Sequence, residues 1–221
     1  MYKKYQVKRA PRAIKPSGQW DSPDWADVEP IDIKEYMGPE EQFKPKTQAK
    51  LLYDDDFVYV IFRVEDKFIR AIAQKNHDPV CNDSCVELFF TPGTDISQGY
   101  INIEVNCGGT ILSRHQTAPM VNRNPLTDEE FERFQIYHSQ PKIVEPEKTE
   151  PATWLIEYRV PIDVLEKRCP VDRPAPKVTW RANFYKCGEK TSHPHWLTWS
   201  VVDNPKPKFH MPEFFGTLEF V

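Results

Sequence analysis

The chain has 221 residues with a formal net charge of −4, and 39% of its residues are hydrophobic and 13% aromatic. That apolar content is enough for a packed core and excludes a largely disordered chain. The sequence pI near 5.9 argues against a nucleic-acid-binding protein, whose binding face is basic. No apolar stretch is long enough to span a membrane. Twenty-one prolines against eight glycines predict many rigid turns.

Residues 1–45 are interrupted by prolines and predict an extended segment that wraps the rest of the chain. Trp20 and Trp25 lie in this segment, and we expect both to pack against a core edge. The basic N-terminus lacks the apolar core of a signal peptide. We therefore expect a cytoplasmic protein, with export after removal of a signal peptide as the alternative.

Short runs of alternating apolar and polar residues follow, as is typical of strands. Residues 47–52 and 57–65 predict a hairpin closed by Asp54, Asp55 and Asp56. Three aspartates could also bind calcium, but turns favour aspartate and the turn is the preferred interpretation. Residues 68–74 fit either a short helix or an edge strand.

The central pair of runs lies within residues 83–106 and predicts two antiparallel strands. One face is apolar and is expected to point inward: Val86, Leu88, Phe90, Ile101, Ile103 and Val105. The other face is polar and carries Glu87, Asn102, Glu104 and Asn106. Such a face is often only the solvated side of a sandwich, and that interpretation stays open, but strands disfavour these side chains and their gathering favours a binding site.

Later elements continue the pattern. A capped helical turn is expected over 127–131 and another helical turn over 161–165. Strands are expected over 135–144, 154–160, 178–188, 196–200 and 216–221, with an exposed charged turn over 145–151. The prediction is a single all-β domain over residues 1–221, a jelly-roll-like antiparallel β-sandwich with long proline-rich loops and one or two short helical turns.

The five cysteines are odd in number and lack the spacing of a disulfide or zinc framework. We expect free thiols and no cofactor or metal. Zinc bound with help from His193 and His195, and a Cys187–His193 nucleophile, are weaker alternatives.

Several short sequence segments also resemble those of a known family. In chain order, these landmark segments are residues 51–55, 58–64, 83–89, 100–106, 154–161, 180–185 and 209–216. This order is similar to that of the family 9 carbohydrate-binding modules, over nearly the whole chain from about Trp20. The resemblance implies a sugar-binding β-sandwich that clamps a sugar end between two aromatic rings.

On that resemblance, Glu87, Asn106 and either Trp196 or Trp199 match binding positions. Glu104 stands where the family has an arginine, and Cys81 stands where a clamp tryptophan would be. The expected function is non-catalytic carbohydrate binding in the catabolism of oligosaccharides or polysaccharides, with the end of such a chain as partner and a polysaccharide-degrading enzyme as a further one. The candidate binding residues are Glu87, Glu104, Asn106, Arg181, Asn183, Trp196 and Trp199.

Two other functions remain as alternatives. Glu87 and Glu104 could serve a glycoside-active enzyme, although side chains opposed on paired strands lie closer than the roughly 5 Å of a retaining carboxylate pair. Trp196 and Trp199 could instead contact a protein partner.

Overall fold

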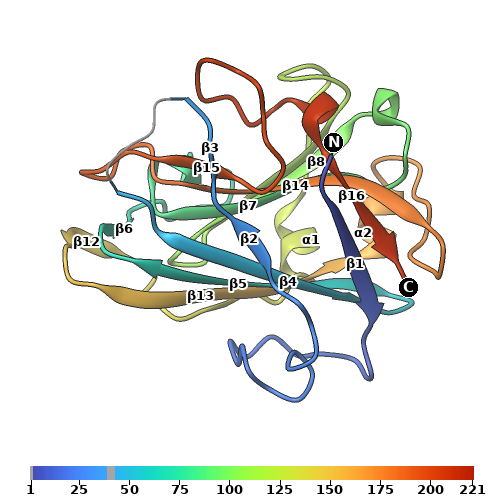
Figure 1. Cartoon of the computed structure of the whole chain (residues 1–221), viewed down its shortest axis with the longest axis horizontal. Helices are drawn as coiled ribbons and strands as arrows, with labels where there is room; N and C mark the ends of the chain where they lie inside the picture. The colour runs from blue at the N-terminus through green and yellow to red at the C-terminus, as the bar shows by residue number, and fades with distance from the viewer. Residues whose placement is uncertain (1, 39–42) are drawn as a thin grey trace.

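The computed structural model describes residues 2–38 and 43–221 and consists mainly of two packed β-sheets (Figure 1). The first sheet runs β10-β9-β8-β7-β14-β16, with β15 and β3 at its side. The second contains β4, β5, β13 and β11, with β2 beside β4. Strand β1 pairs in parallel with β16 through Lys4–Val7 and with β4 through Lys8–Arg9, and so joins the two sheets. The predicted β-sandwich is confirmed.

The strands of the first sheet are β3 (Glu35–Tyr36), β7 (Cys85–Thr91), β8 (Tyr100–Asn106), β9 (Ile111–Gln116), β10 (Asn124–Pro125), β14 (Thr179–Cys187), β15 (Trp196–Thr198) and β16 (Gly216–Phe220). Those of the second are β2 (Ile31–Ile33), β4 (Lys46–Tyr53), β5 (Phe57–Asp66), β11 (Tyr137–His138) and β13 (Ala152–Pro161), with β1 (Lys4–Arg9) between the sheets. Strands β6 (Ile69–Ala71) and β12 (Val144–Lys148) form a separate pair. Two α-helices, α1 (Asp128–Glu132) and α2 (Ile162–Glu166), and three 3₁₀ turns, η1 (Val80–Asn82), η2 (Ile96–Gln98) and η3 (Pro212–Phe214), complete the described elements. Neither helix is long and apolar enough to cross a membrane.

The core lies between the two sheets, where the alternating pattern predicts it. The six apolar side chains of β7 and β8 are all buried there, at most 2% exposed. They pack with Trp180 and Phe184 of β14 and with Phe62 and Trp154 of the second sheet. The expectation of inward-facing β7 and β8 residues is therefore confirmed.

Capping, proline and turn residues in the sequence correctly predicted most of the short elements. Thr127 caps α1 in a reciprocal capping box with Glu130, and Pro161 precedes α2. Asp54 accepts hydrogen bonds from the backbone nitrogens of Asp56 and Phe57, which closes the β4–β5 turn as expected. The edge-strand interpretation of residues 68–74 is correct, since β6 lies there.

Three regions differ from expectation. Residues 135–144 contain the short β11 and only the first residue of β12, because Pro141 falls where a longer strand would have to continue. The predicted turn at 145–151 instead begins with β12, which pairs with β6 across an irregularity in register. Strand β1 was not predicted at all. Of its side chains only that of Val7 is buried, so the alternation that marks a strand is weak.

Part of the N-terminal segment packs on the outer face of the second sheet. Trp20 and Trp25 are buried there against Leu52, Tyr59 and Ile61. The Lys50 ammonium lies 4.5 Å from the centre of the Trp20 ring and donates to the Trp20 and Trp25 carbonyls. This segment is thus fixed by contacts to β4 and β5.

Glu157 of β13 is the main polar anchor of the same segment. Its carboxylate is buried and accepts hydrogen bonds from the backbone nitrogens of Ser17 and Gly18 at 2.7 and 2.6 Å. Trp25 Nε1 donates to the other oxygen at 3.0 Å. Each such bond to a charged group is worth about 1.5–3 kcal/mol.

Glu157→Gln is expected to lower the free energy of unfolding by about 2 kcal/mol, because an amide keeps only one oxygen for three buried donors. Chemical denaturation measures the change, with Glu150→Gln on an exposed turn as the control. A loss no larger than that of the control would show that Glu157 does not anchor the segment.

Candidate functional site

The polar face of β7 and β8 lies on the outside of the first sheet, yet it is buried. Glu87 and Glu104 are only 2% and 6% exposed. The chain between β15 and β16 covers this face, where Val202, Phe209 and Phe215 pack against Phe89 and Tyr185. In Figure 1 this segment forms the long red loop beside β15. The face is therefore not a solvated surface but the floor of an enclosed site.

A pocket of about 250 Å³ opens onto this floor. Glu87 of β7 and Glu104 of β8 stand directly opposite each other in the strand register and both line it. Trp196 of β15 also lines it, and its indole Nε1 donates to Glu189 at 3.4 Å. The remaining lining residues are Cys81, Glu189, Pro207, Lys208, Phe209 and His210. One partly exposed indole therefore lies beside three carboxyl groups, those of Glu87, Glu104 and Glu189.

A row of hydrogen bonds orients the Glu104 carboxyl. Gln116 of β9 donates through Nε2 to Asn102 Oδ1 at 3.1 Å, and Asn102 donates through Nδ2 to Glu104 Oε1 at 2.7 Å. His210 Nδ1 lies 3.3 Å from Gln116 Nε2 and 2.8 Å from the Tyr100 hydroxyl. Because an amide nitrogen only donates, Nδ1 is the acceptor and the His210 proton sits on Nε2.

Burial sets the protonation of these groups. Desolvation raises the pKa of Glu104 to about 7, although the Asn102 hydrogen bond and Arg114 act in the opposite direction. It also raises the pKa of Glu87, to which the neighbouring Cys187 and Glu104 add. Desolvation lowers the pKa of His210 to about 4, so its ring is neutral at pH 7. Neutral carboxyl groups both donate and accept hydrogen bonds, as ligand hydroxyls do.

The raised pKa of Glu104 makes stability depend on pH. Its contribution is complete below pH 4.5, the unfolded value, and is lost as pH rises through 7. Relative to Glu104→Gln, the wild-type protein should lose roughly 3 kcal/mol of unfolding free energy between pH 4.5 and pH 8. Denaturation of both proteins across this range measures the difference. His210 titrates in both proteins, whereas the coupled Glu87 belongs to the difference because Glu104 raises its pKa. A pH-independent difference would contradict the raised pKa of this carboxyl pair.

Three other candidate residues hold the fold rather than face the pocket. Asn106 donates to Asp83 at 2.9 Å and accepts from the Thr110 nitrogen at 2.8 Å. Asn183 donates to the Ser200 carbonyl and accepts from the Ser200 nitrogen, which ties β14 to the following loop. Arg181 donates to the Phe215 and Gly216 carbonyls at the start of β16. These partners leave the three side chains outside the pocket lining, and a binding role for them finds no support here.

Trp196 and Trp199 differ in their exposure and in what they pack against. Trp199 is 5% exposed and belongs to the core between the sheets, with its ring centre 5.6 Å from that of Phe184. A Cβ at Gly216 would lie 2.6 Å from the Trp199 ring, so glycine is required there. Of the two tryptophans, therefore, only Trp196 is available to a ligand.

Side-chain contacts bear on three weaker alternatives: zinc held with help from His193 and His195, a Cys187–His193 nucleophile, and calcium at the aspartate turn. His193 stacks on Phe68 with ring centres 3.6 Å apart, and His195 Nε2 lies 2.7 Å from the buried Lys186 ammonium. Neither imidazole is thus directed at Cys187. Both Asp54 oxygens are used within its hairpin, since the second accepts from the Tyr59 hydroxyl.

The sequence-based analysis missed the covering residues Lys208 and His210, and Glu189. The first two lie in a loop without periodicity that reaches the pocket only through the fold. Phe209-His210 was one of the landmarks behind the family resemblance, and this was the available signal.

Comparison with known proteins identifies the family of the chain. The model of carbohydrate-binding family 9 matches residues 23–220. The chain belongs to carbohydrate-binding family 9. This confirms the family resemblance and the prediction of a carbohydrate-binding protein.

Solved structures share the family 9 fold. A proposed carbohydrate-binding protein from Bacteroides uniformis ATCC 8492 is 27% identical, with a TM-score of 0.88 and full coverage of both chains. A family 9 module from Caldicellulosiruptor kristjanssonii in complex with cellotriose is 15% identical, with a TM-score of 0.67 and coverage of 99% and 93%. A family 9 module from the same organism in complex with glucose is 16% identical, with a TM-score of 0.66 and coverage of 99% of this chain and 96% of that one. No curated protein matches the chain.

Cys81 is one position where this chain departs from the family 9 pattern. The resemblance places this residue where a clamp tryptophan would stand, and Cys81 does line the pocket. Cysteine offers no ring for a sugar face. The pocket of this family 9 chain therefore has Trp196 as its accessible indole, beside the more buried Phe209.

Proposed function

We propose that the pocket binds one sugar unit at the end of an oligosaccharide or polysaccharide, in the service of polysaccharide catabolism. The observation that carries the proposal is the position of Trp196 beside the Glu87 and Glu104 carboxyls in one pocket. A pyranose presents C–H groups that pack on an indole and hydroxyls that need polar partners. The membership in family 9 supports the same ligand class.

The dimensions of the pocket favour one ring over a chain. Its volume of about 250 Å³ lies below the range typical of pockets for larger ligands. The loop over residues 207–210 lines the pocket, so further sugar units would extend into solvent. With one ring contact and a few hydrogen bonds, a dissociation constant in the micromolar to millimolar range is expected.

A calorimetric comparison of chain lengths tests this proposal. Glucose and cellotriose are the first probes, because related modules bind them, and galactose, mannose and xylose series extend the screen. For the sugar that binds, the monosaccharide and the trisaccharide should agree within about threefold, with one site per chain. A more than tenfold gain with length would contradict a one-unit pocket.

A further inference from the structure

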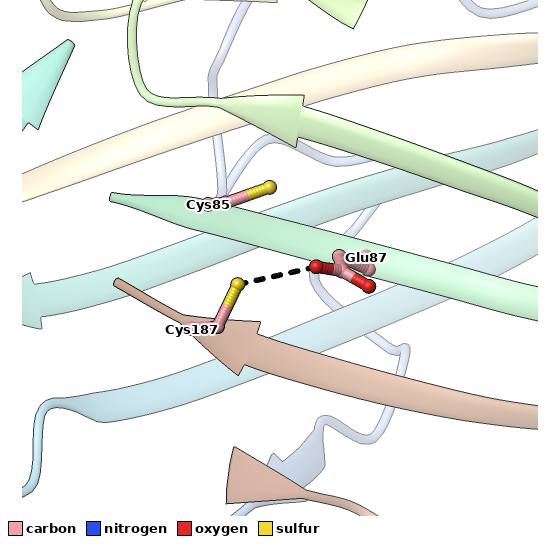
Figure 2. Close-up of side chains that lie close together, drawn as sticks. All are labelled: Cys85, Glu87 and Cys187. Carbon is pink, nitrogen blue, oxygen red and sulfur yellow. Dashed lines mark hydrogen bonds between the residues drawn. The ribbon is translucent and has the colours of Figure 1, made fainter. Parts of the chain in front are cut away.

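Three metal-ligating side chains gather beneath the sugar pocket. Cys85 and Glu87 are two residues apart on β7 and so point to the same face of the sheet. Cys187 of β14 is the direct cross-strand partner of Cys85. Figure 2 shows the Cys187 thiol facing the Glu87 carboxyl across the two strands, with Cys85 beside them. One ligand atom from each residue lies within 4.8 Å of the others.

The distances approach those of a tetrahedral zinc site. Cys187 Sγ lies 3.1 Å from Glu87 Oε1, where the thiol donates to the carboxyl oxygen. Zinc bonds of about 2.3 Å to sulfur and about 2.0–2.2 Å to oxygen separate neighbouring ligand atoms by roughly 3.3–3.8 Å. Small side-chain rotations span the difference. No backbone movement is required, because strand pairing already holds the three Cα atoms.

The ligand types select among metals. Calcium and magnesium take sets of oxygen ligands, and a site with two sulfurs does not suit them. Two thiolates with one carboxylate suit a borderline-soft divalent ion such as zinc. The Lys186 ammonium donates to the Cys187 carbonyl at 2.9 Å, which fixes the backbone at this ligand position.

The pocket supplies a route for the ion. Cys85 and Cys187 are fully buried, but Glu87 lines the pocket as well as contacting Cys187. An ion entering the pocket meets Glu87 first, and a water in the pocket completes a fourth position. We propose that Cys85, Cys187 and Glu87 bind one zinc ion at the floor of the pocket. This site goes beyond sugar binding and does not depend on it.

Zinc binding here must displace protons. Burial raises the pKa of the Cys85 and Cys187 thiols, so both are protonated in the metal-free protein. Since both thiol protons leave, and burial raises the pKa of Glu87 as well, zinc affinity should rise steeply with pH near neutrality. A site made only of carboxylates would show a much smaller pH dependence.

Cobalt titration of the reduced full-length protein tests the site, because thiolate-bound Co²⁺ shows strong near-ultraviolet charge-transfer absorption. The wild-type protein should develop this band with one equivalent of Co²⁺ and lose it when Zn²⁺ is added. Cys169→Ser, whose thiol lies outside the cluster, is the matched control and should behave like the wild type.

Cys85→Ser and Cys187→Ser should each abolish the band and weaken binding at least 100-fold. Cys85→Ala and Cys187→Ala serve as second variants if a serine prevents folding, which circular dichroism checks. The proposal is overturned if the reduced wild-type protein shows no band at millimolar Co²⁺, or if the band persists in folded variants at both positions. Since no sugar is present, failure of this test leaves the carbohydrate site unaffected.

Discussion

Trp199→Ala should destabilise the protein severely, lowering the unfolding free energy by about 3–5 kcal/mol. The Trp199 ring fills the core between the sheets, against Phe184 and the backbone of Gly216. Its removal leaves a cavity that rigid strands cannot close. For a chain of this length the melting temperature should fall by roughly 6–20 °C.

Trp196→Ala is the matched comparison, since the two tryptophans are three residues apart. Trp196 is partly exposed at the pocket, and its truncation should cost less than about 1 kcal/mol. Thermal denaturation of both variants measures the contrast. If Trp199→Ala melted within 2 °C of the wild type, the assignment of Trp199 to the core would be wrong.

Glu87→Ala should weaken sugar binding by about 2–13-fold, the range of one lost hydrogen bond of about 0.5–1.5 kcal/mol to a neutral carboxyl group. The carboxyl is buried with the Cys187 thiol as its hydrogen-bonding partner, and its other oxygen is free to meet a ligand at the pocket floor. Calorimetric titration with the sugar found in the screen measures the loss.

The exposed Glu150 provides the control for this change. Glu150→Ala is the same substitution at an exposed carboxyl outside the pocket and should bind sugar as the wild type does. Equal weakening in both variants would contradict a contact between Glu87 and the sugar.

Alternation was sufficient to predict the core because it is a local property. The inward positions of Val86, Leu88 and Ile103 follow from the period of two, whichever strands are neighbours. Glu87 and Glu104 could likewise be placed on one face before their pairing was known. Strand β1 could not be predicted, since only its Val7 side chain is buried and the alternation is therefore weak.

The sequence alone could not show which group each polar side chain contacts. Asn183 and Arg181 have the chemistry of sugar ligands, yet backbone groups of Ser200 and Gly216 occupy them. Trp196 and Trp199 differ in role because of the loop and strand that pack beside each one. For the same reason Cys85 and Cys187, about a hundred residues apart, show no metal-binding spacing until the strands pair.

The central claim is that sugar binds against Trp196 in this pocket. Its most direct test is a calorimetric titration of Trp196→Ala with the best monosaccharide ligand, beside the wild-type protein. Loss of one stacking contact of about 1–2 kcal/mol predicts binding weakened roughly 5–30-fold in a variant that melts close to the wild type. Wild-type affinity in folded Trp196→Ala would contradict the account.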